Sequence, residues 1–113
     1  MEIGFSTGFF YDRDLIESLP LIRKYGFKVV ELWAGASNWG QYTHYNWLEQ
    51  SYTDALKIKL KENGLRVSSV HAPFSETVDI SSLDENIRKA AVDECVQVTR
   101  ALKELGGDIL VVH

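Results

Sequence analysis

Hydrophobic and polar positions follow two different periods along this chain of 113 residues, and the two periods alternate. Short β-branched and aromatic runs predict strands at residues 3–10, 29–33, 67–71 and 108–113. Between these runs, apolar residues recur every three or four positions, which is typical of amphipathic helices. The pattern therefore predicts the element order βαβαβαβ.

A glycine separates each predicted helix from the strand that follows it. Gly26, Gly64 and Gly106 each stand shortly before an apolar run, where a helix often ends in a left-handed residue. The second helix, for example, is predicted over residues 51–63. Strands joined by helical crossovers are parallel, so we predict a single α/β segment over residues 1–113, with four parallel strands and three helices.

Capping residues predict where two of the helices begin. Asp12 or Asp14 can cap the first helix, and Pro20 inside its pattern predicts a kink or a late start. Ser82 and Glu85 have the spacing of a capping box, which predicts the start of the third helix. The boundary of the first helix is therefore left open, whereas the start of the third is fixed.

Polar residues stand at the carboxyl ends of three predicted strands. Side chains alternate along a strand, so Val67, Ser69 and His71 are expected on one face of the sheet. Glu31 lies in the carboxyl half of the second strand, and His113 ends the fourth. Because parallel strands present their carboxyl ends at one edge, the strand phases predict that Glu31, His71 and His113 face one interior.

The segment at residues 34–50 is rich in aromatic and amide side chains, and its length is more typical of functional connections than of idle ones. Aromatic faces with amides between them, such as Trp39 with its neighbours, suit a sugar or another small polar ligand. The alternative is a loop whose aromatic side chains only pack over the fold. His44, in the same segment, is expected to be exposed.

Composition and charge restrict the classes of function. The chain has 45% apolar and 25% charged residues, as ordinary globular proteins do. Its formal charge of -4 and scattered basic residues argue against a nucleic-acid partner. No apolar run approaches the roughly 20 residues of a membrane helix, and the chain opens into a strand rather than a leader segment. We therefore expect a cytoplasmic protein with no membrane partner.

Two architectures fit a parallel α/β chain, an open doubly wound sheet and a closed barrel. A dinucleotide-binding sheet would carry G-x-G-x-x-G after its first strand, and a phosphate-binding sheet would carry G-x-x-x-x-G-K-[ST]. Neither pattern occurs in the sequence. Polar residues at the carboxyl ends of the strands are typical of barrel enzymes, so the barrel is favoured.

Four segments resemble the xylose isomerase-like TIM barrels: Ile3–Thr7, Tyr25–Leu32, Val70–Phe74 and Leu110–His113. This family includes sugar isomerases and epimerases, inositol-derivative dehydratases and apurinic-site nucleases of the endonuclease IV type. The resemblance implies that the histidines ending strands three and four lie in the active-site cup. They would be metal ligands in the nucleases, and would contact substrate or its surroundings in many isomerases. It also implies that the principal metal-binding carboxylates come from strands five to eight, beyond these four.

A full barrel takes about 250 residues, so the chain is predicted to be the amino-terminal half of a (β/α)8 TIM barrel. The predicted function is that of a metal-dependent isomerase or epimerase acting on a small sugar or polyol. The alternatives are an apurinic-site endonuclease-type metal hydrolase and a non-catalytic half-barrel. The partner of this segment is then a missing carboxyl-terminal half-barrel or a second copy in a homodimer.

The predicted site residues follow from strand position and from the resemblance. We predict that Glu31, Trp33, Trp39 and His71 bind substrate, and that His71 and His113 bind a divalent metal, which is Mn, Zn, Mg or Co. The catalytic base is not assigned.

Overall fold

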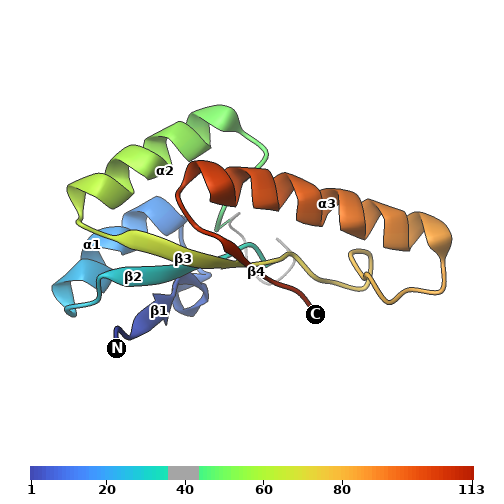
Figure 1. Ribbon diagram of the computed structural model, residues 1–113, viewed down its shortest axis with the longest axis horizontal. Helices are drawn as coiled ribbons and strands as arrows, with labels where there is room; N and C mark the ends of the chain where they lie inside the picture. Colours follow the sequence, from blue (N-terminus) through green and yellow to red (C-terminus); the bar gives the residue numbers. More distant parts are fainter. Residues whose placement is uncertain (36–43) are drawn as a thin grey trace.

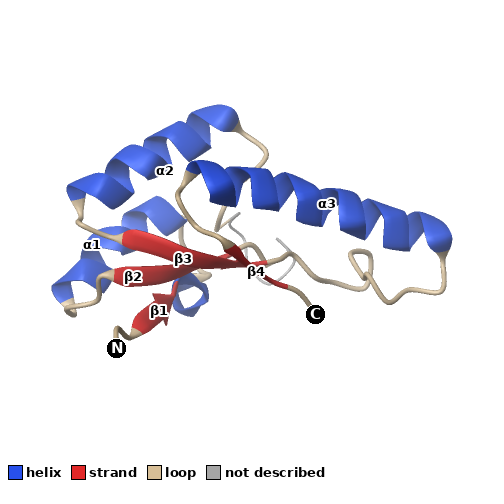
Figure 2. Ribbon diagram, in the orientation of Figure 1, coloured by secondary structure: helices blue, strands red, loops and turns tan. Residues whose placement is uncertain are grey.

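The computed structural model describes residues 1–35 and 44–113. Its four strands form one parallel sheet in the order β1-β2-β3-β4, and the helices connect successive strands (Figures 1 and 2). The strands are β1 (Gly4–Ser6), β2 (Val29–Trp33), β3 (Arg66–His71) and β4 (Ile109–Val111), and the helices are α1 (Leu15–Lys24), α2 (Gln50–Glu62) and α3 (Glu85–Glu104). The predicted parallel βαβαβαβ order is confirmed, although β4 is shorter than predicted.

The first predicted strand is wrong beyond Ser6. Residues Thr7–Phe10 form a 3-10 helix, η1, which Tyr11 closes by donating its N–H to the carbonyl of Gly8 at 3.2 Å. Aromatic residues favour strands on average, but here the Phe9 and Phe10 rings pack edge to face, with their centroids 5.2 Å apart. Aromatic packing within the segment therefore accompanies η1 in place of the predicted strand.

The helix starts agree with the sequence at α1 and differ at α3. Asp14 caps α1, since its Oδ1 accepts the N–H of Ile16 at 2.8 Å, and the helix continues through Pro20. The predicted capping box of Ser82 and Glu85 is wrong, because Asp84 is the N-cap of α3. The Asp84 carboxylate accepts the backbone N–H groups of Asn86 and Ile87, at 2.8 and 3.3 Å.

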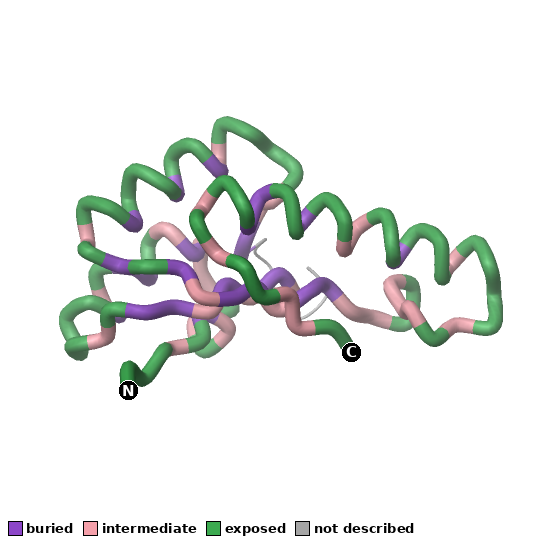
Figure 3. The backbone as a smooth tube through the Cα atoms, viewed as in Figure 1, coloured by how far each residue is buried: buried purple, intermediate pink, exposed green. Residues whose placement is uncertain are grey.

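The hydrophobic core lies between the three helices and one face of the sheet (Figure 3). The helices contribute Leu15, Leu19 and Ile22 from α1, Leu56 and Leu60 from α2, and Val98 and Leu102 from α3. On the sheet, Val30, Leu32 and Val70 point into this core and are fully buried. The opposite face of the sheet therefore carries the side chains that alternate with them. No helix of the described residues is long and apolar enough to cross a membrane.

An irregularity in the pairing of β2 with β3 changes which residues of β3 share a face. Val30 pairs with Val67, but Glu31 pairs with Ser69, so Ser68 is an extra residue in β3. The Ser68 hydroxyl donates to the carbonyl of Val30 at 3.2 Å. Val67 therefore points into the core, and the prediction that it shares a face with Ser69 is wrong. Because of this extra residue, Ser69 pairs with Glu31 on the neighbouring strand.

Candidate functional site

A cleft of about 450 Å³ opens at the carboxyl ends of the first three strands. It is lined by Ser6, Gly8, Tyr11, Glu31, Trp33 and His71. The structure thus brings together three of the four predicted substrate-binding residues, Glu31, Trp33 and His71, and their role stays a prediction. The fourth, Trp39, lies outside the described residues.

Glu31 is held by a serine of the neighbouring strand. The hydroxyl of the buried Ser69 donates to Glu31 Oε2 at 3.2 Å, and the Ser68 hydroxyl lies 3.4 Å from that of Ser69. Within the described part of the chain, no lysine or arginine forms an ion pair with Glu31. Among the described residues, the carboxylate is therefore oriented by a neutral hydroxyl.

His71 and His113 meet at their Nε2 atoms, which lie 2.7 Å apart. His71 Nδ1 lies 3.1 Å from the carbonyl oxygen of Ala72, and because a carbonyl only accepts, this nitrogen carries the proton. In the neutral ring, Nε2 of His71 then has a free lone pair, to which His113 donates its own Nε2–H. The Phe74 ring stacks on His113 with the centroids 4.6 Å apart. The predicted convergence of the two histidines is confirmed.

The two imidazoles fit part of a metal site once His113 carries its proton on Nδ1 instead of Nε2. A ring whose Nδ1–H donates to a backbone carbonyl presents Nε2 in the tautomer that metal-ligating histidines use. Imidazole nitrogen suits Mn, Zn or Co, whereas Mg prefers oxygen ligands. The described residues contain no group of three or more His, Cys, Asp or Glu side chains that could hold a metal ion. The pair would therefore supply two ligands, and the others would come from outside the described residues.

Sequence reasoning missed three of the cleft residues, Ser6, Gly8 and Tyr11, because residues 7–10 were predicted to continue the strand. The Tyr11 ring lies edge-on to Trp33, with the centroids 6.4 Å apart. A glycine inside a strand pattern often marks a close approach of the backbone to another group. Gly8 carried that signal, since a Cβ there would lie 2.8 Å from Cγ of Trp33.

The expected exposure of His44 is wrong, since its side chain is only 5% exposed. Its Nδ1 lies 2.7 Å from the carbonyl oxygen of Arg13, and its Nε2 lies 3.1 Å from Oγ1 of Thr7. Burial lowers the pKa of His44, although the Arg13 carbonyl and the Asp14 carboxylate act in the opposite direction. For residues 44–47, packing over the fold therefore describes the aromatic segment better than a free ligand-binding loop does.

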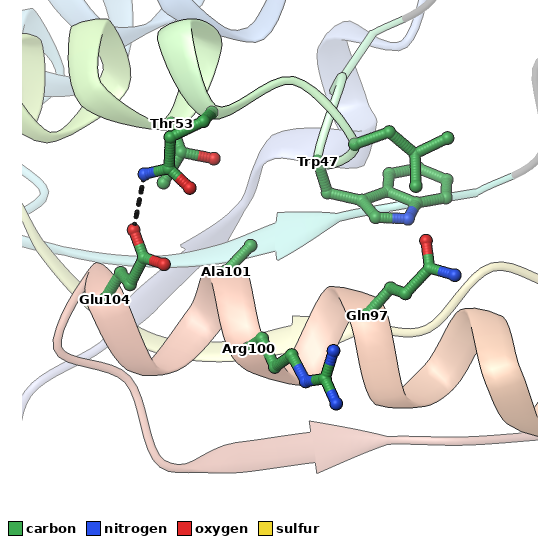
Figure 4. Close-up of a pocket in the computed structure, with 8 residues that line it drawn as sticks. Trp47, Thr53, Gln97, Arg100, Ala101 and Glu104 are labelled. Carbon is green, nitrogen blue, oxygen red and sulfur yellow. Dashed lines mark hydrogen bonds between the residues drawn. The ribbon is translucent and has the colours of Figure 1, made fainter.

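A second cavity, of about 200 Å³, lies between the start of α2 and the side of α3 (Figure 4). The Gln50 amide donates to Glu104 Oε2 at 2.7 Å across it, and Trp47 and Arg100 also line it. This cavity is on the helical side of the sheet and contains none of the predicted site residues. The cleft at the strand ends is therefore the candidate functional site.

Parallel strands whose carboxyl ends place a carboxylate, an indole and an imidazole around one cleft, with a second imidazole hydrogen-bonded to the first, have the arrangement typical of (β/α) barrel proteins. Within that class, the family described as Xylose isomerase-like TIM barrel matches residues 19–113, and the chain belongs to this family. The resemblance to this family is thereby confirmed, and three of the four segments, all but Ile3–Thr7, lie within the matched residues. No curated protein sequence is similar enough to this chain to count as a match.

Solved structures share the fold at low sequence identity. The D-psicose 3-epimerase of Clostridium cellulolyticum H10, solved with D-tagatose, is 22% identical with a TM-score of 0.73. The 3-keto-D-glucoside 4-epimerase of E. coli is 22% identical with a TM-score of 0.71, and the probable 3-DHS dehydratase of Bacillus anthracis is 19% identical with a TM-score of 0.68.

The matches cover 99%, 97% and 99% of this chain but only 37%, 36% and 38% of the solved chains. The chain therefore spans under two fifths of the length of these structures. Together with the family match, this coverage confirms that the chain has the architecture of the amino-terminal half of a TIM barrel.

Proposed function

We propose that this chain forms the amino-terminal half of a metal-dependent isomerase or epimerase that acts on a small sugar or polyol. The observation that supports this most is the arrangement of Glu31, Trp33 and His71 around one cleft, with His113 hydrogen-bonded to His71. The chain belongs to the xylose isomerase-like TIM barrel family, and two of the similar solved structures are sugar epimerases.

Each residue has a proposed part in binding and orienting the substrate. His71 would hold a divalent metal through Nε2, with its Nδ1 fixed by the Ala72 carbonyl, and His113 would do so through Nε2 in the tautomer that carries its proton on Nδ1, where the metal replaces the hydrogen bond between the two rings. The Glu31 carboxylate, oriented by Ser69, would accept hydrogen bonds from sugar hydroxyls, and the Trp33 face would lie against the C–H groups of the sugar. Trp39 remains a proposed substrate contact. A bound metal supplies polarisation of a carbonyl next to the carbon that loses its proton.

A dehydratase is the second candidate, because a probable dehydratase has a TM-score of 0.68 with this chain. Removal of a proton next to a carbonyl begins both reactions, so the same residues would serve. The apurinic-site nuclease alternative requires a surface that attracts phosphates, and the formal charge of -4 does not favour it in this segment. Completion of the barrel by a carboxyl-terminal half or by a second copy stays a prediction.

The test measures metal content and proton exchange in the intact protein. Ketohexoses are incubated with it in deuterium oxide, and NMR follows both deuterium incorporation next to the carbonyl and the products. An epimer supports the first candidate and an unsaturated product the second, whereas cleavage of abasic duplex DNA without either product would overturn both.

His71→Ala and His113→Ala should each lower metal affinity or turnover roughly 10-fold or more and leave the melting temperature nearly unchanged. Turnover that persists after complete removal of metal would refute the metal dependence.

A further inference from the structure

A chain of three hydrogen bonds ties the end of β2 to two segments far away in the sequence. The backbone N–H of Trp33 donates to Oγ1 of Thr7 at 2.9 Å, Oγ1 lies 3.1 Å from Nε2 of His44, and Nδ1 of His44 lies 2.7 Å from the Arg13 carbonyl oxygen. Because that carbonyl only accepts, Nδ1 of His44 carries the proton. In the neutral ring, Nε2 accepts the O–H of Thr7, so every group in the chain has a partner.

The environment keeps this arrangement in one form. Thr7 is completely buried, and His44 is 5% exposed. Burial lowers the pKa of His44, which favours the neutral ring that the hydrogen bonds require. If Nε2 gained a proton it could no longer accept from Thr7, whose O–H would then have to find another acceptor in a buried place.

Two glycines lie directly against the side chain of Trp33. A Cβ on Gly35 would lie 2.1 Å from Cζ2 of Trp33, and a Cβ on Gly8 would lie 2.8 Å from its Cγ. Only glycine leaves room for the ring at these two positions. By contrast, a Cβ on Gly4 would meet its nearest neighbour, Val29, at an ordinary contact distance of 3.6 Å. The backbone of Trp33 is thus held by Thr7, while its side chain lies against two glycine backbones.

We propose that Thr7 and His44 are positioning residues that hold Trp33 as a fixed wall of the cleft, against which the apolar C–H face of a sugar or polyol packs. The part of this inference that concerns sugar deepens the proposed function and rests on it. The part that concerns the placement of Trp33 rests on geometry alone. Because Trp33 is already fixed before the substrate binds, less conformational entropy is lost on binding. Loss of the fixed placement of Trp33 should therefore weaken the affinity for substrate.

Thr7→Val and Thr7→Ser are a matched pair for the test. Valine has nearly the shape of threonine but offers no partner to Trp33 N–H or to His44 Nε2, whereas serine retains the hydroxyl. The intact protein is labelled with 5-fluorotryptophan, and the 19F resonances of Trp33 and Trp47 are assigned from their absence in Trp33→Phe and in Trp47→Phe. Thr7→Val should move the Trp33 resonance and leave that of Trp47 in place, and Thr7→Ser should leave both in place. An unmoved Trp33 resonance, or equal movement of both, would overturn the positioning role.

Sugar kinetics test the second part of the inference. In Thr7→Val, the KM for the ketose that the wild-type protein turns over should rise by roughly tenfold with kcat within about twofold, and Thr7→Ser should restore the wild-type KM. An unchanged KM combined with a shifted Trp33 resonance would overturn the wall as a substrate contact. If the wild-type protein turns over no sugar, the proposed function fails, while the fluorine experiment still decides the placement of Trp33.

Discussion

Replacing Tyr45 by phenylalanine should increase the free energy of unfolding. The Tyr45 side chain is 2% exposed, and its hydroxyl is buried without a hydrogen-bond partner among the residues that the structure describes. Its ring packs against Trp47 and Tyr52, with centroids 5.9 and 6.0 Å away, contacts that phenylalanine retains. A buried hydroxyl without a partner costs about 1–3 kcal/mol in protein mutational data, so its removal should stabilise the fold by about 1 kcal/mol. Burial also raises the pKa of Tyr45, and nearby Glu104 adds to this.

Tyr52→Phe is the matched control, and the expected change has the opposite sign. The Tyr52 hydroxyl lies 3.0 Å from Asp14 Oδ2 and 3.3 Å from the carbonyl oxygen of His44, so it donates to a charged acceptor. Loss of a hydrogen bond to a charged group costs about 1.5–3 kcal/mol, and the lower value applies to a partly buried pair. Urea unfolding of the intact protein measures both variants, with stability compared at equal m-values. A destabilised Tyr45→Phe would refute the reasoning, because it would mean that a partner such as a buried water satisfies the hydroxyl.

Two further predictions concern the surroundings of the cleft. Gly8→Ala should destabilise the protein by about 1–3 kcal/mol, because its Cβ would lie 2.8 Å from Trp33 Cγ, whereas Gly4→Ala should be nearly neutral in the same urea assay. Equal costs for the two alanines would contradict the close approach. The pKa of His44 is lower in the folded state than its ordinary value of about 6.5 in the unfolded state. The contribution of the neutral ring to stability is therefore complete above pH of about 6.5 and is lost as the pH falls through the folded-state pKa. Unfolding between about pH 7.5 and 5 should therefore show a smaller loss of stability in His44→Gln than in the wild type, and identical slopes would exclude this role.

The order and direction of the strands could be predicted because the signals for them are local. Shortly after the end of α2 stands Gly64, with a left-handed φ of 61°, and β3 begins two residues later; the chain repeats the order of helix, left-handed glycine and strand at Gly26 and Gly106. Residues 7–10 were predicted incorrectly because aromatic side chains favour strands only where they pack across a sheet. Here the Phe10 ring packs on the Phe5 ring within the same segment, and the 3-10 helix η1 between them brings the two rings together.

The irregularity at Ser68 shows a second limit of sequence reasoning. Val67, Ser69 and His71 alternate with Ser68 and Val70 as in any regular strand, so the sequence does not indicate that β3 has one residue more than β2 in their pairing. The extra residue is visible only in the pairing with β2, where Val67 lies beside Val30 and Ser69 beside Glu31. Register is a relation between two strands, and the pattern of one strand cannot determine it.

The same distinction separates the two kinds of residue at the cleft. Glu31 and His71 could be placed together from the sequence, because parallel strands bring their carboxyl ends to one edge whatever the intervening chain does. Thr7 and His44 could not, since their contact joins two segments 37 residues apart, one predicted as a strand and the other as a loop. In sequence, valine for threonine at position 7 is a small change inside an apolar run. In the structure it removes the partner of a backbone N–H and of a buried imidazole at once, so the residues that orient this site are identified by their hydrogen bonds rather than by their positions in the pattern.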